Sequence, residues 1–169
     1  RIVSVPASET REGLYYVYAG KGISDIFVRE NEAVDEANSL FGMVLDAAGN
    51  YVWVRGDKET SAQIRMEKVP DTIRSAIAQT TGAREQMALL MEDDPGIFDM
   101  TGCTLDEVLY FVSHGRAVYA IGDDGPVAIV GYDEYNTHLL SPGDEEWHYY
   151  GINDSTAMFE SHGNVFYVF

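Results

Sequence analysis

The order of strand-like and helix-like segments constrains the fold of this chain more than any other feature. Within residues 13–56, short apolar runs bounded by glycines are typical of strands, and one segment repeats apolar side chains at helical spacing. The expected order is two strands, a helix and a hairpin: residues 14–18, 23–28, 31–40, 43–45 and 51–54, with Asn31 as the helix cap. These residues therefore predict a compact ββαββ unit.

The middle of the chain is expected to be helical. Residues 56–67 are polar and indicate a surface loop, and two helices are predicted over 71–82 and 83–92. A third helix, 104–113, begins with Thr104 and Glu107 at the spacing of a capping box, in which each side chain bonds the other residue's backbone N–H. Gly115 is expected to end this helix in a left-handed conformation.

The last third of the chain is again rich in strands. One more helix is expected, capped by Asp154 or Ser155 and running to His162. Strands are expected at 117–121, 127–130, 137–140, 147–150 and 165–169. A strand-rich, then helical, then strand-rich order favours the α+β class. Residues 1–12 are expected to be a linker or frayed end, followed by units 13–56 and 57–169 or by one domain, 13–169.

Charge narrows the possible partners. The chain has 11 Lys and Arg against 28 Asp and Glu, and residues 92–169 contain one basic residue, Arg116, against 15 acidic ones. Nucleic-acid affinity depends on Lys and Arg, and anionic membrane surfaces attract the same residues, so neither partner is expected. Since no apolar run reaches 18 residues, direct membrane insertion is not expected either. The acidic surface either serves solubility or binds a cationic ligand, a peptide or Ca²⁺.

Three segments near the C-terminus share a recognisable pattern. They are Gly102-Cys103-Thr104-Leu105-Asp106-Glu107-Val108-Leu109-Tyr110, His114-Gly115-Arg116-Ala117-Val118-Tyr119-Ala120 and Val127-Ala128-Ile129-Val130-Gly131-Tyr132-Asp133. From Gly102 to Phe169 the chain resembles the C-terminal half of the C39-like, papain-like cysteine peptidases. The resemblance implies a papain-like fold, in which an antiparallel sheet packs on the helices between residues 71 and 113, with the ββαββ unit packed against it or extending the sheet.

A second resemblance concerns the front of the chain. The runs Tyr15–Tyr18 and Val52–Gly56 resemble a segment that precedes the C39-like domain in surface proteins of Gram-positive anaerobes. It implies that the chain is an extracellular or cell-surface fragment of a larger bacterial protein. The chain begins with Arg1 rather than Met, which fits the same expectation.

The family's catalytic residues do not carry over onto this sequence. The papain-like mechanism needs a thiolate at a helix N-terminus, a histidine beside it and a polar residue that orients the histidine. The family's histidine position falls on Gly125 and its aspartate position on Ser141, and neither helix near Asp71 or Ala83 contains a cysteine. The resemblance therefore implies a catalytically inactive cysteine-peptidase-like domain, acting as a binding or regulatory module for a peptide or protein in a larger surface protein.

Two other functions remain open. Cys103 directly precedes a predicted helix, whose dipole would lower the pKa of its thiol, so an active cysteine peptidase or hydrolase could use Cys103 with His114 or His148 as base. The alternative for Cys103 itself is a small buried residue in a tight turn. A structural spacer domain is the remaining possibility.

No cofactor or metal site is expected. The single cysteine excludes a disulfide framework, and the four histidines lack the spacing that gathers zinc ligands. The acidic clusters do not follow the EF-hand pattern, and no phosphate-binding glycine motif follows a strand. Weak binding of a divalent cation by an acidic loop, and the oligomeric state, stay open.

Overall fold

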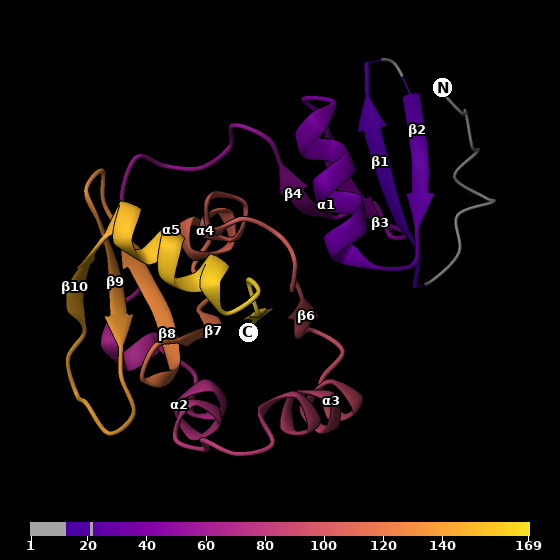
Figure 1. The fold of residues 1–169 in the computed structure, drawn as a ribbon. Coiled ribbons are helices and arrows are strands. Elements are labelled where there is room, and N and C mark those ends of the chain that lie inside the picture. The colour runs from indigo at the N-terminus through magenta and orange to yellow at the C-terminus, as the bar shows by residue number, and fades with distance from the viewer. Residues whose placement is uncertain (1–12, 21) are drawn as a thin grey trace. The chain divides into compact units, whose positions relative to one another are not determined.

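The structure is a computed structural model that describes residues 13–20 and 22–169. The chain divides into two compact units, with the boundary between Asp57 and Lys58. Each unit contains its own antiparallel sheet, one of four strands and one of seven (Figure 1). The linker expected at residues 1–12 lies outside the described residues.

The first unit is a four-stranded sheet with one helix. Its elements are β1 (Tyr15–Ala19), β2 (Gly22–Phe27), α1 (Glu30–Ser39), β3 (Met43–Asp46) and β4 (Tyr51–Val54), and the strands lie in the order β2-β1-β3-β4. This is the expected ββαββ order. The unit's core contains fully buried apolar residues of the helix and sheet: Val17, Ala33, Val34, Ala37 and Val44. The helix begins after Arg29 without a side-chain cap, so the expected cap at Asn31 is wrong.

The second unit is built on the larger sheet. Its elements are β5 (Ala62–Gln63), η2 (Met66–Lys68), α2 (Asp71–Ile77), α3 (Ala83–Asp93), β6 (Phe98–Asp99), α4 (Leu105–Ser113), β7 (Val118–Gly122), β8 (Gly125–Tyr132), β9 (Asn136–Leu140), β10 (His148–Gly151), α5 (Ile152–Ser161) and β11 (Phe166–Val168). The strands lie in the order β10-β9-β8-β7-β11-β6, and β5 pairs with β8. Antiparallel sheets with helices confirm the α+β class.

Helices cover both faces of this sheet. Successive residues of a strand point to opposite faces, so Phe166 and Tyr167 of β11 mark the two sides. Phe159 of α5 packs edge-on against Phe166, with ring centroids 5.6 Å apart. The guanidinium of Arg84, on α3, lies over the ring of Tyr167. The central strand β8 is therefore buried within the sheet, which has helices on both faces.

The predicted capping box of α4 is present. The Thr104 hydroxyl accepts a hydrogen bond from the Glu107 backbone N–H, and the Glu107 carboxylate accepts one from the Thr104 N–H at 2.8 Å. Gly115 follows the helix with φ of +81°, the left-handed conformation that glycine adopts without steric cost. The helix is buried along most of its length. The capping box defines where it begins, and Gly115 follows its end.

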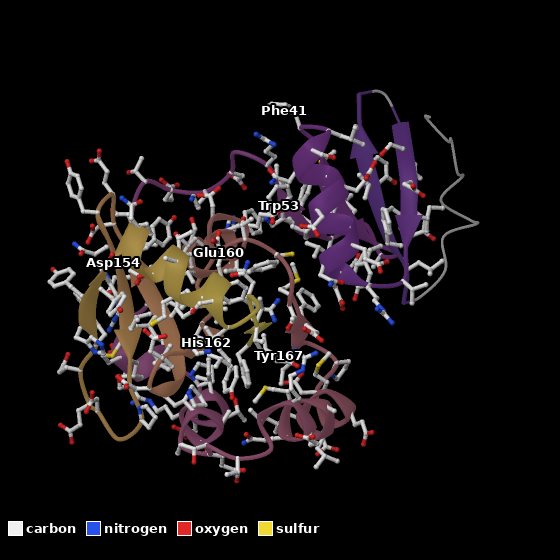
Figure 2. All side chains as sticks on the ribbon, viewed as in Figure 1. Phe41, Trp53, Asp154, Glu160, His162 and Tyr167 are labelled. Atoms are coloured by element: carbon white, nitrogen blue, oxygen red, sulfur yellow. The ribbon has the colours of Figure 1, made fainter. Side chains whose placement is uncertain are left out.

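Two predicted helices differ at their ends. Helix α2 ends at Ile77 rather than at residue 82, since Thr80 and Thr81 have low helix propensity and Gly82 takes a left-handed φ of +66°. Helix α5 begins at Ile152 after Gly151, so neither Asp154 nor Ser155 is its cap. Asp154 lies in the first turn, where the helix dipole favours a carboxylate. Figure 2 shows Asp154 toward one end of α5 and His162 toward the other.

The segment expected to be a surface loop, residues 56–67, also contains regular structure. Ala62 and Gln63 form the short strand β5, and a 3₁₀ turn follows at Met66–Lys68. A two-residue strand has no periodicity, so the sequence could not indicate it. Among the described residues, no helix is long and apolar enough to cross a membrane.

Candidate functional site

The candidate site lies where β5 joins the central strand β8. Strand β7 pairs with β8 only as far as Ile129, which leaves one edge of β8 free beyond that residue. Ala62 and Gln63 fill this edge by pairing with Tyr132 and Gly131. On the other edge, Val130 is the extra residue of a β-bulge in the pairing with β9. Bulges of this kind redirect side chains and are common beside functional sites.

The bulge anchors Gln63. The Val130 carbonyl accepts the backbone N–H of Ile64 at 2.8 Å and the side-chain amide of Gln63 at 3.2 Å. The same amide nitrogen also donates to the Ile64 carbonyl at 2.8 Å. With both amide protons used, the side-chain oxygen of Gln63 points toward β9.

His138 of β9 receives that oxygen and bridges to the β8–β9 turn. Its Nδ1 lies 2.5 Å from Gln63 Oε1, and its Nε2 lies 2.9 Å from Asp133 Oδ2. The other oxygen of Asp133 accepts the backbone N–H groups of Tyr135 and Asn136 at 2.8 and 2.9 Å. The imidazole therefore links β5, β9 and the turn, and neither ring nitrogen is free to act as a base.

Aromatic side chains near β10 cover the imidazole. The ring of Trp147 stacks on His138 with centroids 4.1 Å apart and planes 10° apart, and Tyr149 meets it edge-on at 5.1 Å. Only 7% of His138 is exposed. The contact also explains Gly131, because a Cβ there would lie 2.6 Å from His138 Nδ1 and closer still to the Gln63 oxygen. We call Gln63, Asp133, His138, Trp147 and Tyr149 the histidine cluster.

A cavity rich in acidic residues adjoins this cluster. Its volume is about 540 Å³, and Asp133 belongs to both. The lining comes from the start of the second unit, α4, the β8–β9 turn and the start of α5: Lys58, Glu59, Thr60, Asp106, Leu109, Tyr132, Asp133, Glu134 and Ile152. We call it the carboxylate pocket. Four carboxylates against one ammonium group give it a net negative charge.

Contacts inside the pocket hold its walls together. The Lys58 ammonium group pairs with the exposed Asp106 carboxylate and lies 5.5 Å from the centre of the Tyr132 ring. The Tyr132 hydroxyl donates to the Glu59 carbonyl at 2.5 Å. Burial raises the pKa of the Tyr132 phenol, and the hydrogen bond from His138 lowers the pKa of Asp133. At neutral pH the pocket therefore presents a neutral Tyr132 phenol and an ionised Asp133 carboxylate.

The pocket is better suited to an organic cation than to a metal ion. A hard cation such as Ca²⁺ needs several oxygen ligands converging on one point. Within the described part of the chain, the four pocket carboxylates do not bring three ligand atoms within 4.8 Å of one another. The lining also includes the apolar side chains of Leu109 and Ile152 and the ring of Tyr132, which would favour a ligand with a hydrocarbon stem.

A second pocket, of about 410 Å³, lies between α2 and the β9–β10 loop. Ser141, which the sequence resemblance aligned with the family's aspartate, lines it together with Arg74, Asp144 and Glu145. Helix α2 begins at Asp71 after Pro70, and no cysteine lies in or beside it. Gly125, which the sequence resemblance aligned with the family's histidine, is the first residue of β8 and adopts φ of +109°, so it shapes the β7–β8 turn.

The structure does not bring Cys103 together with His114. Cys103 is fully buried just before α4, whereas His114 is the C-cap of the same helix. Eleven residues at 1.5 Å each place the two backbones about 16 Å apart. His114 Nδ1 bonds the Tyr110 carbonyl at 2.8 Å, and the His114 ring packs on the Tyr110 ring. His148 lies exposed on β10, paired with Leu139 of β9.

Sequence reasoning missed the histidine cluster. Gln63 lay in a segment expected to be a loop, and His138 stood in a predicted strand without a partner. The available signal was Gly131-Tyr132-Asp133 followed by His138: a glycine before a turn aspartate, with a histidine on the returning strand. The role of Gln63 depends on the pairing of β5 with β8, which sequence spacing does not indicate.

Comparison with known proteins gives one distant structural match. The chain matches the crystal structure of a proposed C39-like peptidase from Bacillus anthracis with a TM-score of 0.43 and 16% sequence identity. The match covers 53% of this chain and 57% of that chain. No family model matches the sequence, and no curated protein matches it.

Proposed function

We propose that this chain is a catalytically inactive C39-like module of a larger surface protein, and that it binds a cationic peptide in the carboxylate pocket. The observation that carries the proposal is the pocket itself, whose lining combines four carboxylates with apolar side chains in an already acidic unit. Residues 58–169 contain 6 basic and 19 acidic residues, a net charge of −13. This field attracts basic ligands to the surface before the pocket binds them.

The inactive state is supported by the position of the only thiol. A catalytic cysteine needs a reachable thiolate and a nearby base. Cys103 is fully buried, and the histidine closest to it along the chain, His114, caps the far end of α4. The structural alternative, a small buried residue in a turn, accounts for Cys103 more simply, since its backbone N–H bonds the Met100 carbonyl at 3.1 Å.

The ligand class follows from the chemistry of the pocket lining. A lysine or arginine side chain has a long hydrocarbon stem and a charged head, so it can pack on Leu109 and Ile152 while its head meets the carboxylates. A volume of about 540 Å³ is within the range of small-molecule sites and admits one or two such side chains. A peptide with spaced basic residues matches this arrangement better than a single small cation.

The test is calorimetric titration of the protein with a short oligolysine peptide. In the double variant Asp106→Asn/Glu134→Gln, two exposed carboxylates of the pocket become neutral. We expect the peptide to bind about five- to tenfold more weakly, because each lost surface charge pair costs up to about 1 kcal/mol. The matched control, Asp144→Asn/Glu145→Gln, removes the same charge from the second pocket and should change affinity by less than about twofold.

Two results would contradict the proposal. Equal weakening by both double variants would mean that the peptide responds only to the overall negative field. Cleavage of the peptide in reducing buffer would show that the module is an active enzyme. If Cys103→Ala abolished that cleavage, the cysteine hydrolase that uses Cys103 would replace the inactive module.

A further inference from the structure

The charge of His138 can be read from its hydrogen-bond partners. Both amide protons of Gln63 are committed to the carbonyls of Ile64 and Val130. The reversed amide would point its oxygen at these two carbonyl oxygens, which repel it. Gln63 therefore offers His138 an acceptor, and the Nδ1 atom 2.5 Å away must carry a proton to make this bond.

Nε2 faces a second acceptor. The Asp133 carboxylate has no proton to donate at neutral pH, because its hydrogen bonds favour the ionised form and lower its pKa. Its Oδ1 is already held by two backbone N–H groups, and its Oδ2 lies 2.9 Å from Nε2. A neutral imidazole has only one N–H, so one of its two nitrogens would present a lone pair to an oxygen.

We propose that His138 is held as an imidazolium cation at neutral pH, and that its second proton locks β5 and the segment before β10 onto the sheet. The inference does not depend on the proposed function. The cation bridges three parts of the chain that are far apart in sequence: Gln63 on β5, Asp133 in the β8–β9 turn and Trp147 before β10.

Burial alone would favour a neutral histidine, so the cation needs compensation. Asp133 supplies a full negative charge and Gln63 a carbonyl dipole. The parallel stack of Trp147 adds attraction between the cation and the aromatic face. Among the described residues, the titratable side chains that contact the ring are Asp133 and Tyr149.

The pair of His138 with Asp133 depends on pH through Asp133. The pKa of Asp133 is lowered, so its contribution to stability is present above the ordinary aspartate range and is lost as the pH falls. Acidification therefore opens the cluster.

The experiment is a nitrogen-15 NMR titration of the histidine side chains of the full chain, in which protonated and bare ring nitrogens have separate chemical shifts. We expect both nitrogens of His138 to carry protons at pH 7. His162, an exposed histidine with one carboxylate partner, Asp123, serves as reference in the same spectrum. A bare nitrogen on His138 at pH 7 would overturn the assignment.

Asp133→Asn is the decisive variant. The two backbone N–H groups retain the asparagine oxygen, so its NH₂ group turns toward His138 Nε2 and requires an acceptor there. We expect His138 to become neutral, with its single proton on Nδ1, while the His162 signals stay unchanged. Unchanged signals of His138 in the folded variant would also overturn the assignment.

The effect of the second proton on β5 is measured by hydrogen exchange at Ile64, whose N–H bonds the Val130 carbonyl beside the cluster. In Asp133→Asn at pH 7, the Ile64 amide should exchange faster than in the original chain, because β5 opens when His138 lacks its second proton. Equal exchange in the two proteins would show that the proton does not hold β5.

Discussion

Two buried tyrosines of the second unit differ in whether the hydroxyl group has a hydrogen-bond partner. The Tyr132 hydroxyl donates to the Glu59 carbonyl at 2.5 Å. Tyr119 is completely buried on β7, and its hydroxyl finds no hydrogen-bond partner among the described residues. Burying an unpaired hydroxyl costs free energy, whereas a paired one contributes about 1 kcal/mol.

Phenylalanine substitutions at these two residues should therefore have opposite effects. We expect Tyr132→Phe to lower the free energy of unfolding by about 0.5–1.5 kcal/mol, and Tyr119→Phe to leave it unchanged or raise it. The measurement is urea unfolding of both variants beside the original chain. A loss in Tyr119→Phe as large as that in Tyr132→Phe would reveal a partner for the Tyr119 hydroxyl.

The burial of Tyr119 also leads to a prediction about the pH dependence of stability. Burial raises the pKa of Tyr119 to about 12 from the ordinary 10, so between these values the folded state holds a proton that the unfolded state releases. Stability from this group is complete below pH 10 and is lost as the pH rises toward 12. In unfolding curves at increasing alkaline pH, Tyr119→Phe should lose stability less steeply than the original chain. Parallel pH curves would contradict the assignment of this loss to Tyr119.

At the residue scale the sequence predicted local chemistry better than long-range contact. Thr104 and Glu107 lie within one helical turn, so their spacing alone indicated the capping box. Gln63 and His138 are 75 positions apart, and their contact depends on the bulge at Val130 and on the missing side chain of Gly131. Residue types show what these side chains could do, but only the sheet pairing brings them together.

At the scale of elements, the cap of α4 is the most directly testable feature. Replacing Thr104 by Ala leaves the Glu107 N–H without its side-chain partner, so we expect a loss of about 1 kcal/mol in the free energy of unfolding. Thr104→Ser keeps an acceptor at the same place and should recover most of this loss. The exposed Thr80→Ala, outside any helix, is the control and should change stability by less than about 0.5 kcal/mol. If Thr104→Ala changed the free energy of unfolding as little as Thr80→Ala, the stability of α4 would not depend on its cap.

Long, periodic elements were predicted well, and short ones were not. The strands near residues 15–19, 51–54 and 136–140 have apolar runs that the sequence displays directly. Strands β5 and β6 have two residues each, so their existence depends entirely on a neighbour with a free edge. The ends of α2 and α5 also differ from the prediction. Helix α2 ends at Ile77 with Ala78 as its C-cap, and α5 follows β10 directly with Gly151 as its N-cap.

At the scale of the whole molecule, the division at Asp57 and Lys58 leads to a prediction about folding. Each sheet is complete within its own unit, and the second unit contains the buried strands β7, β8 and β9 with helices on both faces. At about 110 residues it is large enough to bury a core of its own. We therefore expect residues 58–169 to fold without residues 1–57.

The test is expression of residues 58–169 and urea unfolding followed by Trp147 fluorescence. Because this fragment carries a net charge of −13, its self-repulsion should weaken as salt screens it, so its unfolding midpoint should rise between about 0.01 and 0.15 M salt. A cooperative transition with this salt dependence would establish an independent unit, in which the histidine cluster and the carboxylate pocket form together. A broad, non-cooperative transition at both salt concentrations would instead show that residues 13–169 fold as one domain, since the second sheet would then need the first unit to reach its native state.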